Sequence, residues 1–184
     1  MPSPTPSPSS ALPRQERFRG RAAPGSPSKL TDVSYKTADA RLHLLETLAD
    51  ATDDLGAALS ALTEAYELAD EGMADRLERE LFNPLQRAYG RARRTHSEFA
   101  QRHQLADRTF EPPTAGAPSH GLRGFLDSAS EAVQRAETTL AGLQDSMLPV
   151  EVGDPQLRSG LEQVRELIGR FPAHTRELER TLGR

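Results

Sequence analysis

Two histidine–glutamate pairs have the spacing that could place an imidazole and a carboxylate on one helical face. His43 precedes Glu46 by three residues, and His174 precedes Glu177 by the same step. The di-metal sites of four-helix bundles use the reverse order, Glu-x-x-His, together with inward-facing glutamates. Both pairs here flank an apolar stripe, and such pairs are common on helix surfaces. We therefore expect surface ion pairs, and keep as the alternative a small-ligand or metal-binding bundle that uses His43, Glu46, His96 and His174.

A further pair of histidines, His96 and His103, lies seven residues apart on or beside the apolar face of a helical stretch, with Phe99 between them. A buried pair at this spacing could ligate haem or a metal, or respond to pH. Both lie near the expected C-terminal end of a helix, where positive charge is favoured. We expect half-exposed, hydrogen-bonded histidines rather than a ligand pair.

The densest basic cluster, Arg87, Arg91 and Arg94, could grip phosphate. The sequence has no helix-turn-helix pattern and no interleaving of aromatic and basic residues, which argues against nucleic acid as a partner. It carries no nucleophile elbow, phosphate loop or dinucleotide fingerprint, and zero cysteines exclude thiol catalysis. We therefore expect a protein that is not an enzyme, with no catalytic, cofactor or metal residues.

The elements that must position these residues follow from apolar periodicity. Four stretches carry apolar residues at alternating three- and four-residue steps: 45–69, 77–99, 122–147 and 157–182. Such a repeat keeps one seam of a helix against a partner helix. Thr52 and Thr175 are polar intruders in the seams, which either set the register or bond back to their own helix. The prediction is an all-α fold, an elongated antiparallel four-helix bundle made of two helical hairpins.

Turn and cap signals divide the 184-residue chain. We expect a Pro/Gly connector at 105–119, a bend at Phe171-Pro172, and helices at about 35–70, 73–104, 120–148 and 155–183. The first hairpin could turn at Gly72 or at Asn83-Pro84, because Asn followed by Pro is a common helix start.

Charge favours Gly72 as the turn, because acidic residues then face basic ones along the hairpin. The expected neighbours are Asp50 with Arg93, Asp53 and Asp54 with Arg91 and Arg87, Glu64 with Arg79, and Glu67 with Arg76. We therefore predict the turn at 70–73 and a kink at Pro84.

Residues 1–30 are rich in Pro and Ser and carry a net charge of +4, five basic residues minus one acidic. The chain totals −4, so residues 31–184, the expected helical domain, carry −8. We expect this arm to be disordered, and its contact with an anionic surface is a third hypothesis. No apolar run approaches the ~20 residues that cross a bilayer, and the N-terminal stretch lacks the apolar core of a signal peptide. We therefore expect no membrane span and a cytoplasmic protein.

Two lysines against 21 arginines, with abundant alanine, indicate a GC-rich bacterial genome. Our preferred hypothesis is a non-enzymatic helical bundle that acts by protein–protein interaction, as an adaptor, a regulator or a self-associating scaffold. The heptad seams can close within one chain or between chains, so a protein partner or self-association is expected.

Overall fold

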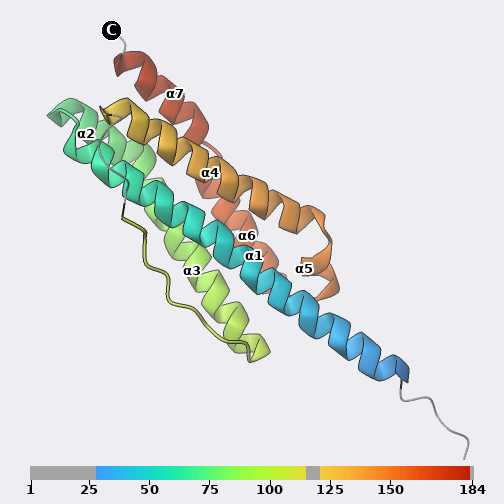
Figure 1. The fold of residues 1–184 in the computed structure, drawn as a ribbon. Coiled ribbons are helices and arrows are strands. Elements are labelled where there is room, and N and C mark those ends of the chain that lie inside the picture. Colours follow the sequence, from blue (N-terminus) through green and yellow to red (C-terminus); the bar gives the residue numbers. More distant parts are fainter. Residues whose placement is uncertain (1–27, 115–120, 183–184) are drawn as a thin grey trace, which may run out of the picture.

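The computed structural model describes residues 28–114 and 121–182. The elements are α1 (Ser28–Glu67), α2 (Glu71–Leu77), the π-helical turn η1 (Glu78–Phe82), α3 (Asn83–His103), α4 (Gly121–Asp145), α5 (Leu148–Glu151), α6 (Pro155–Ile168) and α7 (Phe171–Leu182). The described residues contain no strand, and the predicted all-α fold is confirmed (Figure 1). Most of the arm predicted to be disordered lies outside the described residues.

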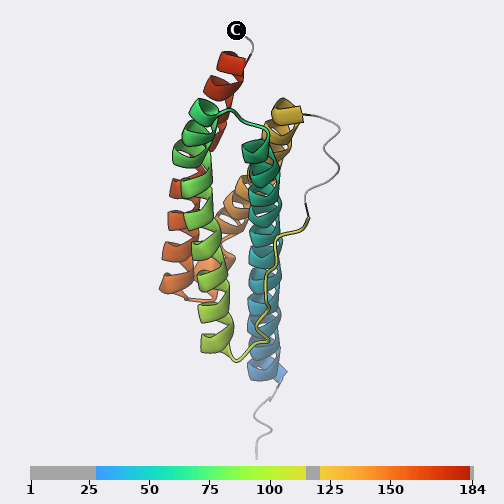
Figure 2. The ribbon, with the colours of Figure 1, turned by 90° about the vertical axis from the view of Figure 1, so that its left-hand side faces the viewer.

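The helices form four rods, α1, α2–η1–α3, α4 and α6–α7, arranged as a square. The α1 rod packs against α3 and α4, and the α6–α7 rod packs against the same two rods. Each rod runs antiparallel to both of its neighbours (Figure 2). A bundle with only short turns would alternate up and down along the chain, whereas here α3 and α4 both run opposite to α1. The chain between them must therefore travel the length of the bundle.

Helix α1 is longer than predicted. It begins at Ser28, seven residues before the expected start at 35, so residues 28–30 belong to a helix and not to the arm. Clear apolar periodicity begins only at Leu44, and a start placed from periodicity therefore falls late. The first third of α1 projects beyond the other rods (Figure 1).

The first hairpin turns near Gly72, as predicted, and not at Pro84. Helix α1 ends at Glu67, and Asp70 caps α2 by accepting a hydrogen bond of 2.9 Å from the Met73 N–H. A carboxylate at this position satisfies a free N–H of the first helical turn. The capping geometry, rather than Gly72 itself, ends the turn.

The ion pairs that pointed to this turn are wrong in their partners. Asp53 pairs with Arg108 of the connector, at 2.7 Å between Oδ2 and Nη2, instead of with Arg91 or Arg87. Asp54 pairs with Arg135 of α4, at 2.9 Å between Oδ1 and Nε. The connector and α4 also flank α1, and they supply the partners of both aspartates.

The other predicted pairs of the hairpin are also wrong, because their arginines contact residues of their own rod. Arg76 and Arg79, expected opposite Glu67 and Glu64, instead contact Glu80 of their own rod at 3.4 and 3.5 Å. Arg93, expected opposite Asp50, lies over the ring of Tyr89 on α3, with its guanidinium carbon 5.4 Å from the ring centroid.

The predicted disturbance at Pro84 takes the form of the π-helical turn η1, which directly precedes it. The N–H of Asn83 bonds to the carbonyl of Glu78, five residues back. The wider turn lets the rod continue past a proline that would otherwise clash with the preceding turn. The predicted bend at Phe171-Pro172 is confirmed, because α6 ends at Ile168 and α7 begins at Phe171.

Rods α3 and α6 approach each other closely at Gly160. A Cβ at this position would lie 2.4 Å from Oγ1 and 3.0 Å from Cβ of Thr95. Glycine is therefore favoured here by the close side chain of Thr95 and not by its own torsion angles.

Helix α4 ends at Asp145, three residues before the expected end, and Met147 takes up a left-handed conformation with φ 63°. The short helix α5 follows and packs against α1. Helix α6 then begins at residue 155, as predicted, with Asp154 as its cap and Pro155 as its first residue.

Candidate functional site

The interior of the bundle is apolar along its whole length. Among the described residues, five polar side chains are buried: Thr52, Thr95, His96, Asp154 and Thr175. The hydroxyls of Thr52 and Thr175 donate to carbonyls four residues back in their own helices, at 2.7 and 3.0 Å. Of the two explanations open from the sequence, bonding back to the helix accounts for both threonines.

The structure does not bring the four residues of the alternative ligand site together. His43 and Glu46 are both exposed on α1. His174 contacts η1, and His96 is buried against the connector. Within residues 28–114 and 121–182, no group of three or more histidine or carboxylate side chains is arranged to hold a metal ion.

His174 has a structural partner that Pro84 creates. Proline has no N–H, so the carbonyl of Glu80, four residues earlier, lacks its regular helical donor. His174 Nδ1 lies 3.1 Å from this carbonyl oxygen. A carbonyl only accepts, so Nδ1 carries the hydrogen and joins α7 to the disturbed turn of the neighbouring rod.

The expectation that His96 is half-exposed is wrong, because it is 2 % exposed and packs against the connector. Its ring meets Phe110 edge-on, with 4.9 Å between centroids, and Nδ1 lies 3.3 Å from Oδ1 of Asp107. Burial lowers the pKa of His96, and the neighbouring Asp107 opposes this shift. A hydrogen bond from the Ser97 hydroxyl, 2.7 Å to Oδ2, helps to hold the pKa of Asp107 below its ordinary value.

His103 belongs to a second cluster, which centres on Asp154. Arg102 donates to both carboxylate oxygens of Asp154, at 3.0 and 3.1 Å, and His103 Nε2 lies 3.0 Å from Oδ2. The Leu157 N–H donates to Oδ1 at 2.8 Å. Burial works against ionisation, but these hydrogen bonds outweigh it and lower the pKa of Asp154. The cluster fastens the end of α3 to the start of α6, which is a structural role.

The arginine cluster does not form one anion site. Arg87 donates to the Asn83 carbonyl and borders a cavity of about 490 Å³ beside the α6–α7 junction. Arg94 borders another cavity, of about 440 Å³, beside the connector. Arg91 lies partly buried, and its Nε has no hydrogen-bond partner among the described residues.

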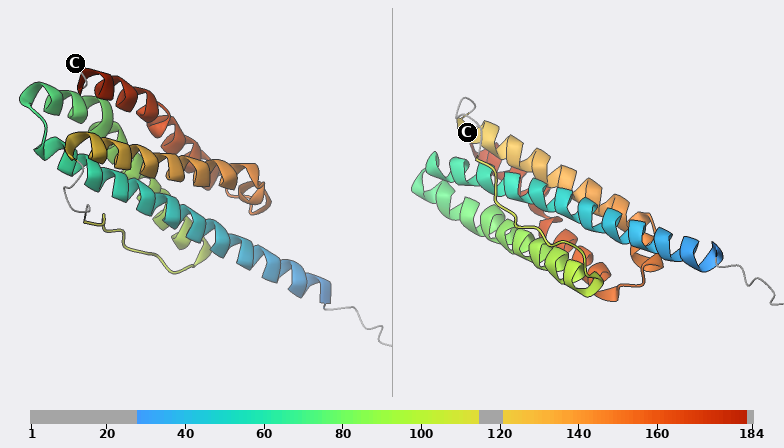
Figure 3. Two further views of the ribbon diagram at one scale, coloured as in Figure 1. Left: turned by 45° about the horizontal axis from the view of Figure 1, so that its top comes forward. Right: turned by 60° about the horizontal axis from the view of Figure 1, so that its bottom comes forward.

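Residues 105–114 of the connector form a strap along the groove between α1 and α3 (Figure 3). Phe110 is 5 % exposed, and its carbonyl accepts a hydrogen bond of 3.3 Å from the Tyr89 hydroxyl. A Cβ at Gly56 would lie 3.6 Å from Cα of Pro112. The Ser60 hydroxyl donates to the carbonyl of Pro113. The sequence identified this segment as a polar connector, and Phe110 was the one aromatic residue that could have indicated its burial.

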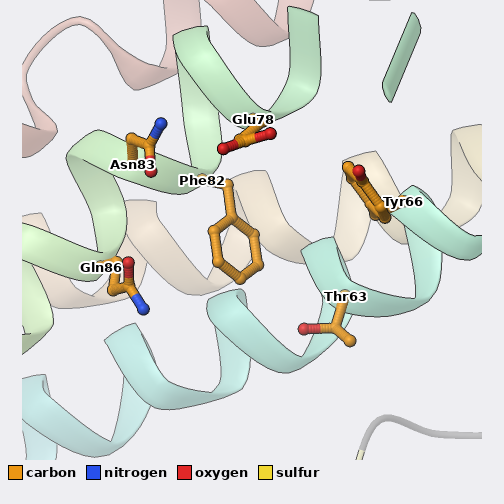
Figure 4. Close-up of a pocket in the computed structure, with 6 residues that line it drawn as sticks. All are labelled: Thr63, Tyr66, Glu78, Phe82, Asn83 and Gln86. Carbon is orange, nitrogen blue, oxygen red and sulfur yellow. The ribbon is translucent and has the colours of Figure 1, made fainter. Parts of the chain in front are cut away.

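The same groove continues beyond residue 114, and the described residues leave part of it unfilled. A pocket of about 360 Å³ lies there, lined by Thr63, Tyr66, Glu78, Phe82, Asn83 and Gln86. Phe82 projects between the two rods, with Thr63 and Tyr66 of α1 on one side and Gln86 on the other (Figure 4). Two partly exposed aromatic rings and several hydrogen-bonding groups thus face an unfilled space.

Large exposed apolar side chains gather at the ends of the bundle. Tyr66 and Leu68 lie at the α1–α2 turn. Met147 and Val150 lie at the α4–α5 turn, at the opposite end. The Asp54–Arg135 pair sets the register of α1 against α4 and places Leu42, also exposed, near the level of the α4–α5 turn. We call Leu42, Met147 and Val150 the α5 patch.

None of the described helices is both long enough and apolar enough to cross a membrane, as predicted. Comparison with known proteins adds no function: no protein family, no curated protein and no solved structure matches the chain.

Proposed function

We propose that the protein is a non-enzymatic helical bundle that acts through protein–protein contact, as an adaptor, a regulator or a self-associating scaffold. The observation that supports this proposal is the α5 patch. The exposed fraction is 45 % for Leu42, 54 % for Met147 and 47 % for Val150. Grouped apolar side chains on a surface are typical of interaction sites, whereas single ones are ordinary.

The position of the patch also favours a protein partner. It lies where α1 projects past the other rods, so a second helical protein can lie along α1 and cover α5 at once (Figure 1). Methionine adapts its shape to different apolar partners, which suits such a surface.

A photoreactive residue tests the proposal. We would place it at Met147 of the full chain and, as a matched control, at Ser128, which is exposed on α4. In the cells that make the protein, we expect defined protein adducts at position 147 and none of them at position 128. Val150→Glu should abolish the adducts without changing helicity. Equal adducts at both positions, or none at 147, would contradict the proposal.

A further inference from the structure

The strap shows which kind of chain the α1–α3 groove accepts. Its residues are extended, an aromatic ring is buried, and two prolines follow it over Gly56. The carbonyls of Phe110 and Pro113 accept hydrogen bonds from hydroxyls of the rods. Proline-rich segments bind aromatic-lined grooves in this way because their extended form loses little entropy.

The open part of the groove repeats these features. Going along the groove away from the strap, Thr63 and Tyr66 follow Ser60 on α1, and Gln86 and Phe82 follow Tyr89 on the other rod. Rings and groups that can donate hydrogen bonds to carbonyls again face each other. This part of the groove is therefore built to accept a segment of the same kind as the strap.

The charge around the open groove specifies its occupant further. Glu78 lines the pocket, and Glu67 directly follows Tyr66. Residues 63–80 carry seven carboxylates and two arginines, a net charge of −5, seven minus two. Such a surface favours a basic segment.

The chain itself contains a segment with this chemistry. Residues 1–27 hold seven of its 14 prolines, and Arg14, Arg17, Arg19 and Arg21 against one glutamate. The arginines follow Leu12-Pro13, which offers an apolar residue beside a proline, as the strap does.

The arginine-bearing part of this segment is too short to reach its own groove. Ser28 and Tyr66 lie at opposite ends of one helix, about 57 Å apart at the usual rise per residue. Fourteen residues separate Arg14 from Ser28, and even a fully extended chain of that length spans at most about 50 Å. We therefore propose that the groove at Tyr66 and Phe82 binds the proline- and arginine-rich N-terminal segment of a second copy of this chain. The proposal rests on the self-associating form of the proposed function.

Disulfide capture tests the proposal in the full chain, which has no cysteine of its own. A chain carrying Gln15→Cys is mixed with one carrying Thr63→Cys, at the groove, or Ser128→Cys, the exposed control on α4. We expect the disulfide to Thr63→Cys to form at least about tenfold faster than the disulfide to Ser128→Cys, because docking raises the effective concentration of the two thiols. Adding Tyr66→Ser to the Thr63→Cys chain should return the rate to that of the control.

Equal rates at the two positions would overturn the proposal. One chain carrying both Gln15→Cys and Thr63→Cys separates a second copy from a fold-back within the chain. Dimers on a non-reducing gel support the proposal, and monomers closed by an internal disulfide overturn it. If disulfide capture fails while the adducts at Met147 form, this inference falls and the proposed function stands.

Discussion

Replacing Gly160 with alanine places a methyl group inside the contact distance of Thr95. The new Cβ would lie 2.4 Å from Oγ1, 2.6 Å from Cγ2 and 3.0 Å from Cβ of Thr95. The last atom is fixed by the backbone of α3, so a rotamer change cannot relieve every contact. Overpacking of this kind costs about 1–3 kcal/mol. Alanine recovers up to about 1 kcal/mol in helix propensity, so we expect a net loss of about 1–2 kcal/mol.

Thr95→Ala provides the second side of a double-mutant cycle. It removes the two closest atoms and leaves only the contact at 3.0 Å. It also removes a buried hydroxyl that has no partner among the described residues. We expect Gly160→Ala to cost about 1 kcal/mol less in this background, because the two residues share one contact.

The matched control is Gly142→Ala, since no atom lies within 4 Å of a Cβ built there. It should stabilise the protein by about 0.4–1 kcal/mol. Thermal and urea unfolding followed by circular dichroism measure all four variants, and each kcal/mol shifts Tm by about 2–4 °C for a chain of this size. If Gly160→Ala were as stable as Gly142→Ala, or if the cycle were additive, the close approach of α3 and α6 would be refuted.

Three further predictions concern two other contacts between rods and the contact between the strap and the rods. Asp154→Ala should lower the free energy of unfolding at pH 7 by about 2–3 kcal/mol, because it removes a helix cap and charged hydrogen bonds. Folding lowers the pKa of Asp154, so the stability that its carboxylate contributes is present above about pH 3.8 and is lost as the pH falls through the folded pKa. The stability difference between Asp154→Ala and the parent chain should therefore shrink in urea titrations at lower pH. A deficit independent of pH would contradict the assigned ionisation. Phe110→Ala should release the strap and speed proteolysis of residues 105–114 while the helices keep their dichroism, whereas unchanged cleavage would contradict its anchoring role. His174→Phe should lower the free energy of unfolding by about 1 kcal/mol, because it leaves the Glu80 carbonyl without its donor. The loss should be smaller in a Pro84→Ala chain, because the restored N–H of residue 84 can donate to that carbonyl. Equal losses in both chains would refute the link between Pro84 and His174.

Much of the fold could be predicted because it depends on local signals. Apolar periodicity located the four rods, and α6 begins at the predicted residue 155, where Asp154 caps it. Phe171-Pro172 marked a bend because proline restricts the backbone wherever it stands. The start of α1 was misplaced because the stretch before Leu44 lacks a clear periodic signal.

The contacts between distant segments could not be predicted from these signals. Asp53 and Asp54 pair with the strap and with α4 because both flank α1, and only the three-dimensional arrangement determines that. The burial of Phe110 is of the same kind, since a single aromatic residue in a mostly polar segment has no period. The alternative site of His43, Glu46, His96 and His174 assumed that facing helices bring histidines together, whereas the structure distributes them among unrelated partners.

The long return of the strap also affects how fast the protein folds. Because the strap returns along the bundle, α1 has α4 as its second neighbour. Asp54 of α1 therefore pairs with Arg135, 81 residues away. Loop-closure entropy must be overcome before such distant contacts form, and folding slows as the mean sequence separation of contacts rises. We therefore expect slower refolding than for a single helical hairpin, whose contacts all close across one short turn. Stopped-flow dilution from urea would measure the rate.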